Sequence, residues 1–297
     1  MACTEVPPKF QTKKNVLDDS RCNDLARGRN QYHIFDPFGS SVVIGSHSAR
    51  SREMDSHVKG VRLNEFGQPI GQDVPSFTPP DDAKLGLGFQ GRLVSLEPLS
   101  FHHSEDLYDA FSRNDASLWT YLSFGPFETL ESFNENYMKR MCLSGEFIMF
   151  AIISMHTGKP LGCAGYLRVF PQHGSVEIGA LTFSGALQRT AEATEALYLM
   201  IKRCFDLGFR RCEWKCDALN EPSVRAAQRL GFKYEGTFRQ ATIYKGRNRD
   251  TKWFSILDRE WPSLDEEFQR WLHKDNFDEA GSQKKRLRCS SVGVNGS

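Results

Sequence analysis

The period of the hydrophobic residues changes once in the middle of the chain, and this change constrains the fold most. Three β-type segments follow one another directly, at residues 147–154, 161–170 and 175–183. Gly158 and Gly174 lie between them, as is typical of consecutive hairpins. Apolar residues then recur at helical spacing over residues 193–205, and Gly208 ends that helix. A three-stranded meander followed by an amphipathic helix predicts a sheet with the helix packed on one face.

The flanking segments extend this pattern. Before the meander we expect a strand and two helices, at residues 92–97, 104–111 and 128–143. After the central helix we expect a strand, a helix, two strands paired across a loop at 245–249, and a last helix, at residues 211–217, 222–230, 233–244, 251–258 and 263–272. The order β α α β β β α β α β β predicts an α/β fold of the mixed (α+β) type, with helices on both faces of the sheet.

Composition divides the chain into four parts. We expect a disordered N-terminal extension, an extended arm that packs on the domain, the folded domain and a disordered basic tail, at residues 1–58, 59–90, 91–276 and 277–297. Phe66, Ile70 and Phe77 are the expected anchors of the arm. Met54 precedes the more organised segment and is a second candidate for the start of translation.

Charge and hydropathy exclude several classes of protein. The chain has 38 Lys+Arg and 37 Asp+Glu, a formal net charge of +1, which argues against a nucleic-acid partner. No apolar run approaches the roughly 18 residues that cross a bilayer, and the first residues lack a signal-peptide pattern. We therefore expect a cytoplasmic protein without a membrane partner, with nuclear targeting by the basic cluster at 284–288 as the alternative.

The cysteines predict free thiols rather than a disulfide framework or a metal centre. The eight cysteines contain no CxxC pair and are too sparse for a disulfide scaffold, which fits a reducing compartment. Cys212 and Cys216 share one face of a predicted strand, but a metal site there would need two more ligands. His273 is the only later histidine, so we expect no metal.

The segment Leu187–Ala196, Leu-Gln-Arg-Thr-Ala-Glu-Ala-Thr-Glu-Ala, begins the central helix. A loop that ends at a helix N-terminus presents unpaired N–H groups and a partial positive charge, which suit a diphosphate. Arg189 adds a formal charge, and the small residues Ala191 and Ala193 let the backbone approach a ligand closely. Glu192 opposes a bound phosphate, so its side chain should point away. The alternative is an alanine-rich helix start without a ligand.

A second segment, Asn220-Glu221-Pro222-Ser223, begins the next helix, and Leu230-Gly231-Phe232 ends it. Pro222 in the first turn and Asn220 before it are both explained by helix capping alone. Asn220 lies eleven residues before Gly231, a separation that capping alone does not require.

A third segment is the strand Ser175–Phe183. Strand alternation predicts that Glu177, Gly179 and Leu181 face one way, and Val176, Ile178 and Ala180 the other. A glutamate in the middle of a sheet is costly unless it is paired, hydrated or used in chemistry. Glu177 is therefore a candidate general base, a group that orients substrate, or part of a structural ion pair. Gly179 allows a bulge that would separate this strand from its neighbour.

Residues 86–272 resemble the GNAT superfamily of acyl-CoA-dependent N-acetyltransferases, and within it the RimJ/RimL-type branch. The pyrophosphate loop of that superfamily has Gln or Arg, then Gly and Gly or Ala at the third and fifth positions beyond it. Gln188 and Ala193 match, whereas Ala191 replaces the Gly and requires helical backbone there. The resemblance implies a mostly antiparallel sheet of about seven strands, splayed in the middle, and acetyl-CoA as co-substrate.

The resemblance also implies roles for particular residues. Acetyl-CoA would contact the end of the third strand, the loop and the next helix start, at Leu181, Thr182, Phe183, Gln188, Arg189, Thr190, Ala191, Glu192, Ala193, Thr194, Asn220 and Ser223. Asn220 would contact the pantetheine arm, and an N–H near Leu181 or Thr182 would polarise the thioester carbonyl. Many relatives place a Tyr seven residues after this Asn to protonate the leaving thiolate, but Ala227 stands here. The RimL-like branch uses a Ser three residues after it, so Ser223 is the candidate donor beside Glu177.

The run Tyr244–Thr251 is a basic hairpin tip and resembles the same run in a subgroup of RimJ/RimL-like proteins. That subgroup also contains the motif Asn64–Pro69. The cations of the hairpin tip fit either a solvated turn or a loop that gates substrate or faces a phosphate.

These features favour an enzyme that transfers acetyl from acetyl-CoA to a primary amine by direct attack in a ternary complex. The alternative is a non-catalytic acyl-CoA-binding or regulatory module, which the residues Ala191 and Ala227 favour. The acceptor is either a small amine or a protein N-terminus, and the protein is expected to be a monomer or a homodimer.

Overall fold

The computed structural model describes residues 62–113, 116–279 and 281–289. The chain divides into two compact units, Met1–Asp73 and Val74–Ser297. The predicted N-terminal extension, residues 1–58, lies outside the described residues.

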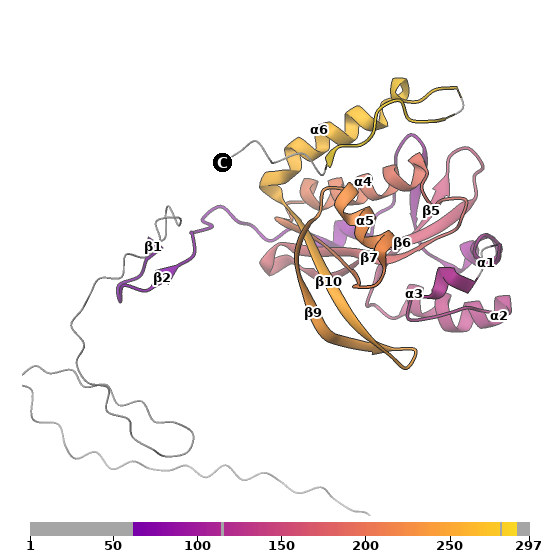
Figure 1. Cartoon of the computed structure of the whole chain (residues 1–297), viewed down its shortest axis with the longest axis horizontal. Coiled ribbons are helices and arrows are strands. Elements are labelled where there is room, and N and C mark those ends of the chain that lie inside the picture. The colour runs from indigo at the N-terminus through magenta and orange to yellow at the C-terminus, as the bar shows by residue number, and fades with distance from the viewer. Residues whose placement is uncertain (1–61, 114–115, 280, 290–297) are drawn as a thin grey trace, which may run out of the picture. The chain divides into compact units, whose positions relative to one another are not determined.

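In the first unit the described residues form a small antiparallel ribbon of β1 (Arg62–Leu63) and β2 (Pro69–Ile70) (Figure 1). The Asn64 side chain closes the turn between them by accepting the backbone N–H groups of Phe66 and Gln68. An asparagine at the start of a turn commonly makes this type of bond to the backbone two residues on.

The second unit begins with an extended segment that is attached to the sheet at two points. The ring centroid of Phe77 lies 5.9 Å from the Arg210 guanidinium, and Leu85 is fully buried. Because Phe66 and Ile70 belong to the first unit, a single arm over residues 59–90 stays a prediction.

The second unit is built on an eight-stranded sheet with the order β3-β4-β5-β6-β7-β8-β10-β9 (Figure 1). Every neighbouring pair is antiparallel except β7 and β8, which are parallel. The mixed α/β fold is therefore confirmed, with β3 as an edge strand too short to show a period in the sequence. The strands are β3 (Phe89–Gln90), β4 (Val94–Pro98), β5 (Ile148–Ser154), β6 (Pro160–Phe170), β7 (Ser175–Phe183), β8 (Arg211–Asp217), β9 (Lys233–Tyr244) and β10 (Arg247–Leu257).

Helices cover both faces of this sheet. They are α1 (Ser104–Ser112), α2 (Leu130–Phe133), α3 (Lys139–Leu143), α4 (Ala191–Asp206), α5 (Glu221–Arg229) and α6 (Trp261–Leu272). A π-helical stretch, Asn134–Met138, joins α2 to α3, so that the predicted helix at 128–143 is one continuous element. Short 3-10 turns lie at Asp82–Gly86, Phe101–His103, Ala116–Trp119, Pro171–His173, Asp258–Glu260 and Lys274–Asn276.

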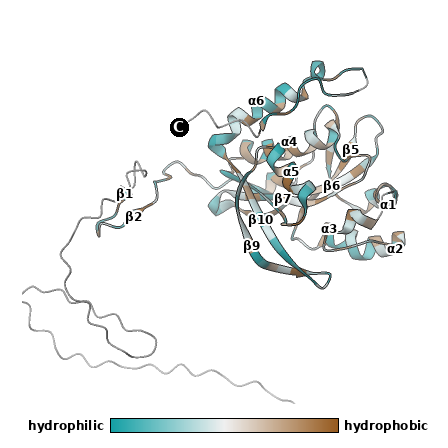
Figure 2. Cartoon of the chain, in the orientation of Figure 1, coloured by the Kyte–Doolittle hydropathy of each residue, from teal (hydrophilic) through white to brown (hydrophobic). Residues whose placement is uncertain are grey.

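Two apolar clusters hold the helices on the sheet. Val176 and Ile178 of β7 pack in the cluster that contains the buried residues of α4, α5 and α6. Phe133, Tyr137 and Cys163 belong to a second cluster that contains the buried residues of α1 to α3. Figure 2 shows hydrophobic colours concentrated in the sheet and hydrophilic colours along much of the β9–β10 hairpin. Among the described residues, no helix is both long and apolar enough to cross a membrane.

The predicted element boundaries lie within two residues of those observed, except at the β9–β10 hairpin. The loop predicted at 245–249 is wrong, because β10 begins at Arg247 and only Lys245 and Gly246 form the turn. Their φ angles of 50° and 68° are those of a tight turn that matches the twist of the strands. A lysine at a positive φ is uncommon, so the residue types did not indicate this turn.

The C-terminal segment differs from the disordered tail expected at 277–297. Trp271 Nε1 donates to Gln283 Oε1 at 2.8 Å, and Leu287 and Cys289 are buried in the cluster beneath α6. Residues 281–289 therefore form part of the folded unit.

The parallel pair β7–β8 separates after only three rungs, which end at Glu177 opposite Glu213. Just beyond, β7 carries a bulge against β6, with Ala180 at φ 51°. The bulge predicted at Gly179 is present, although the left-handed residue is its neighbour. It reverses the alternation of β7, so Ala180 packs beneath α1–α3 and Leu181 beneath α4, opposite to the faces predicted for them.

Candidate active site

The N-terminus of α4 forms one end of the candidate site. Thr190 is its N-cap: its side chain accepts the backbone N–H of Ala193 at 3.0 Å, and its carbonyl accepts that of Thr194. Ala191 and Glu192 therefore carry the N–H groups of the first turn that point out of the helix. The loop before it begins at Ser184, whose hydroxyl is buried and has no hydrogen-bond partner among the described residues. Exposed N–H groups at a positive helix end together with an unused hydroxyl suit a diphosphate.

The structure settles three expectations about this loop. Ala191 is the first helical residue, as its replacement of the usual Gly requires, and Arg189 has the positive φ of 62° instead. Glu192 accepts the Ser154 hydroxyl at 2.6 Å, so its carboxylate is held by β5. Gln188 donates its side-chain amide to the Phe183 carbonyl at 2.8 Å and thus stabilises the loop itself.

The free edge of β7 continues from this loop toward the splay. In the described part of the chain, no rung joins β7 to β8 beyond Glu177 and Glu213. The backbone of Leu181, Thr182 and Phe183 therefore borders the gap between the two strands. Thr182 is fixed from the other face, where its hydroxyl accepts the Tyr137 phenol at 3.0 Å. A strand edge held rigidly in this way can donate N–H groups to a ligand in the gap.

The N-terminus of α5 lies across the gap at the end of β8. Asn220 is its N-cap and accepts the Ser223 N–H at 3.2 Å, the capping role that the sequence indicates. The Ser223 hydroxyl accepts Trp214 Nε1 at 3.0 Å, which leaves its proton available for another acceptor. Cys216 also contacts this hydroxyl, and burial raises the pKa of its thiol. Ala227, where many relatives have Tyr, is fully buried in the core.

Glu177 lies at the base of the splay in a network of ion pairs. Its Oε2 pairs with the Arg168 guanidinium and lies 3.3 Å from Lys215 Nζ. Lys215 Nζ also lies 2.8 Å from Glu213 Oε2 and 3.4 Å from the centroid of the Trp253 ring. Burial lowers the pKa of Lys215 to about 8, against the opposing effect of Glu213.

The two oxygens of Glu177 have different surroundings. Whereas Oε2 takes both cations, Oε1 faces Gly179, and a Cβ there would lie only 3.2 Å from it. This places one carboxylate oxygen at the start of the bulge, beside the free edge of β7. Of the three roles predicted for Glu177, the ion pair is present, and the orientation of Oε1 is compatible with the other two.

Sequence reasoning missed Arg168, Lys215 and Trp253, which complete this cluster. Glu213 and Lys215 alternate with buried residues on β8, the same signal of a charge inside a sheet that singled out Glu177. Arg168 has a positive φ of 44° at an irregularity in β6 that no residue type announces.

The basic hairpin tip is exposed, and two of its cations donate to backbone carbonyls of another segment. Lys245 Nζ donates to the Trp119 carbonyl and Arg247 Nη2 to the Thr120 carbonyl, each at 2.7 Å. Tyr121 in turn donates its hydroxyl to the Leu219 carbonyl at 3.1 Å. The 119–121 segment thus bridges the β9–β10 hairpin and the loop after β8.

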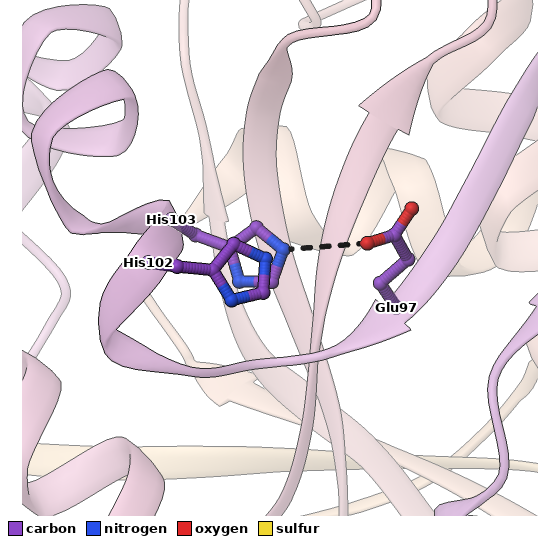
Figure 3. A group of neighbouring side chains, drawn as sticks. All are labelled: Glu97, His102 and His103. Carbon is purple, nitrogen blue, oxygen red and sulfur yellow. Dashed lines mark ion pairs between the residues drawn. The ribbon is translucent and has the colours of Figure 1, made fainter.

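A separate group, Glu97, His102 and His103, brings three possible metal ligand atoms within 4.8 Å of one another (Figure 3). The backbone N–H of Ser100 donates to His103 Nδ1 at 3.2 Å, which assigns the ring proton to Nε2, 3.6 Å from Glu97 Oε2. Burial lowers the pKa of His103 and favours this neutral form. The nitrogen that faces Glu97 is therefore a donor, and the group caps the 3-10 turn before α1.

Cys163, Cys204, Cys212, Cys216 and Cys289 are buried free thiols, as predicted for cysteines of the folded domain, and Cys142 is a half-buried one. Burial raises the pKa of Cys163 to about 12, so this thiol is a poor nucleophile.

Known proteins share both the sequence and the fold of this domain. The protein-family model described as an acetyltransferase (GNAT) domain matches residues 94–233. The crystal structure of a GCN5-related N-acetyltransferase from Brucella melitensis is similar to this domain, with a TM-score of 0.65. The two sequences are 43% identical, and the matched region covers 67% of this chain and 91% of the Brucella chain. The chain belongs to the GNAT acetyltransferase family.

Two further GNAT relatives agree. The crystal structure of a probable acetyltransferase of the GNAT family from Chromobacterium violaceum ATCC 12472 has a TM-score of 0.61 against this chain. The two sequences are 39% identical, and the matched region covers 66% of this chain and 98% of the Chromobacterium chain. The uncharacterized N-acetyltransferase p20 of Bacillus licheniformis is 28% identical over 151 residues, 50% of this chain and 84% of its own. Family membership supports acetyl transfer from acetyl-CoA.

Proposed function

We propose that this GNAT protein transfers acetyl from acetyl-CoA to a primary amine by direct attack in a ternary complex, as an enzyme of the RimJ/RimL-type branch. The observation that carries this is Glu177 Oε1, which faces Gly179 at the point where β7 leaves β8. A carboxylate oxygen at the base of the gap can take a proton from an amine that approaches the β7 edge.

The coenzyme side follows from the helix start and the strand edge. Residues 181–183 border the gap with their backbone, and the N–H groups of Ala191 and Glu192 at the start of α4, together with Arg189, carry the positive charge for a diphosphate. Asn220, at the start of α5, lies across the gap for the pantetheine arm. Acetyl-CoA supplies an acyl group that is already activated as a thioester.

The reaction needs one proton transfer at nitrogen and one at sulfur. As the nitrogen of the neutral amine bonds to the acetyl carbon and the bond from that carbon to sulfur breaks, Glu177 Oε1 takes a proton from this nitrogen and later releases it to solvent. The Ser223 hydroxyl gives its proton to the departing sulfur and regains one from solvent. Trp214 Nε1 donates to the Ser223 oxygen and so favours donation of the Ser223 proton outward.

The test is acetylation of an amine panel by the full chain, followed by mass analysis of the products and of free CoA. We expect product and CoA in equal amounts with at least one amine. Glu177→Gln should lower kcat by about 10²-fold or more, since general-base catalysis contributes on that scale. Ser223→Ala should lower it less, and exposed Lys202→Met should leave it unchanged. Unchanged kcat in both site variants would refute the two assignments.

One observation favours the second candidate, a non-catalytic acyl-CoA-binding module. The Glu177 side chain is only 5% exposed and pairs with two cations, which is also the pattern of a structural ion pair. A module of this kind would bind acetyl-CoA but release no CoA with any amine, whereas the enzyme releases CoA only with an acceptor.

A further inference from the structure

The acceptor side of the site carries two arginines, Arg168 beside Glu177 and Arg249 beside Thr251, and they indicate which second group the acceptor amine carries. The Arg168 side chain is 45% exposed, whereas the Glu177 side chain that it pairs with is 5% exposed. The Arg168 guanidinium also lies 5.8 Å from the centroid of the Trp253 ring. Arg168 therefore lies on the solvent side of the buried carboxylate.

Arg249 lies on the same side of the sheet. Its Nε donates to Thr251 Oγ1 at 3.2 Å, and Thr251 and Trp253 point to one face of β10 because they are two residues apart. Burial lowers the pKa of the Arg168 guanidinium, and the nearby positive charge of Arg249 adds to that effect against Glu213. Both guanidinium groups therefore lie against side chains on the same face of β10.

The cations of this cluster differ in their partners. Lys215 pairs with Glu177 and Glu213, and Arg211 pairs with Glu213 and Glu235. Arg249 has no carboxylate within ion-pair distance among the described residues, and Arg168 uses one nitrogen on Glu177. Arg168 and Arg249 are therefore the cations of this cluster with the fewest carboxylate partners. The Arg249 guanidinium also lies 5.9 Å from the centroid of the Tyr244 ring, whose hydroxyl donates to Asp217.

The backbone at Arg168 supports a role beyond packing. A non-glycine residue at φ 44° is held in a sparsely populated conformation, and such residues concentrate at functional sites. Here that conformation occurs in the residue that carries the guanidinium beside Glu177.

We propose that the acceptor is a primary amine that also carries an anionic group, as a free amino acid does, and that Arg168 and Arg249 bind this group. The inference rests on the proposed acetyltransferase function. A guanidinium fork matches a carboxylate in geometry as well as charge. When the anion pairs with Arg168, the contact of Arg168 with Glu177 is released, and the carboxylate becomes accessible to the amine.

The same charges disfavour two other kinds of acceptor. A polycation would bring like charge against Arg168 and Arg249, which costs affinity. A peptide N-terminus has a neutral amide where a free amino acid has its carboxylate, so it offers neither guanidinium group an anion.

The experiment compares acceptors that differ only in the anionic group. Each standard amino acid is assayed with acetyl-CoA and the full chain beside its amide and its decarboxylated amine, and phosphoethanolamine tests phosphate as the anion. We expect kcat/KM for the best amino acid to exceed that of its amide by about 10-fold to 100-fold, as for a charge-assisted pair. A preference for phosphoethanolamine over both would assign the same arginines to a phosphate.

Substitutions test whether the two arginines cause the preference for an amino acid over its amide. Arg249→Gln should lower kcat/KM for the amino acid about tenfold and leave that of the amide unchanged. Arg168→Gln should reduce the same preference. The control is Arg140→Gln, because Arg140 is also an exposed arginine paired with one glutamate, Glu146, but lies on α3. Calorimetry of amino-acid binding to the chain saturated with CoA should show the same loss of affinity for Arg249→Gln.

The outcomes separate the two proposals. Equal kcat/KM for an amino acid, its amide and its decarboxylated amine would overturn the inference and leave the acetyltransferase function intact, as would a preference for peptides that Arg249→Gln does not change. Acetyl-CoA binding without CoA release for any acceptor would overturn the proposed function itself.

Discussion

The two sides of the candidate site are built in different ways. The coenzyme side is nearly continuous in sequence, residues 181–194, and consists mainly of backbone groups at a strand edge and a helix start. The acceptor side brings together Arg168, Glu177, Lys215 and Trp253 from β6, β7, β8 and β10. Backbone groups tolerate many changes of side chain, whereas a network of buried charges depends on each member.

This difference predicts where the molecule is sensitive. Substitutions on the acceptor side should affect both stability and catalysis, because the charges that position Glu177 also join β7 to β8 where their rungs end. Substitutions on the coenzyme side should affect binding of acetyl-CoA with little change in stability. The following changes test this contrast in order of decreasing effect.

Lys215→Met should have the largest effect on stability. It removes the ammonium between the facing carboxylates Glu177 and Glu213, and breaking a buried pair costs about 3 kcal/mol or more. The measurement is the free energy of unfolding in urea. The matched control is Lys202→Met, because the Lys202–Asp206 pair is exposed and should contribute less than about 1 kcal/mol.

The pH dependence of this difference has a definite sign. The pKa of Lys215 is lowered from 10.5 to about 8 in the folded chain, so the unfolded chain binds more protons between these values. Relative to Lys215→Met, the wild-type protein should therefore gain stability as the pH rises from about 8 to 10.5. A difference that falls or stays constant over this range would show that pairing with Glu177 and Glu213 outweighs the burial of the Lys215 ammonium.

Gly179→Ala should mainly affect catalysis. The added Cβ would lie 3.2 Å from Glu177 Oε1 and 3.4 Å from Leu167 Cδ1, so the carboxylate must shift. A displaced base should lower kcat about tenfold or more, while KM for acetyl-CoA changes little. Gly236→Ala is the control, because a Cβ on Gly236 of β9 meets no atom within 4 Å. Equal kcat in the two variants would show that the position of Glu177 Oε1 does not affect the rate of acetyl transfer.

Trp214→Phe should have a smaller effect on kcat. It removes the N–H that donates to Ser223 Oγ, a bond worth about 1 kcal/mol or about fivefold in rate. In a Ser223→Ala background the same change should have no further effect on kcat. Trp271→Phe controls for the loss of an indole, since Trp271 of α6 is equally buried and donates to Gln283 of the C-terminal segment. Additive effects of Trp214→Phe and Ser223→Ala would show that Trp214 acts on packing alone.

The contrast between the two sides also explains what could be predicted from the sequence. Periodicity and turn residues located the elements of the domain, because each signal lies within one short segment. The loop before α4 was identified for the same reason. Glu177 was identified as a charge inside a sheet, but its partners Arg168 and Lys215 were not, because strand order places them beside it only in three dimensions.

The exchange of faces at Ala180 and Leu181 has a related cause. Alternation along a strand assigns faces correctly only until a bulge shifts it by one residue. Gly179 indicated that a bulge was possible, but the residue with positive φ is an alanine, which gives no local signal. The acceptor side is therefore the part of the site that required the structure.

Arg189→Gly should have the smallest effect and tests the coenzyme side. Glycine accepts the φ of 62° without strain, but it also increases the entropy of the unfolded chain, so stability should change by less than about 0.5 kcal/mol. Loss of the charge at the helix N-terminus should raise KM for acetyl-CoA about fivefold. Gln240→Gly, at φ 48° on β9, matches the backbone change and should leave this KM unchanged. A loss of stability above about 1 kcal/mol for Arg189→Gly alone would show that side chains hold this loop too, and the contrast between the two sides would fail.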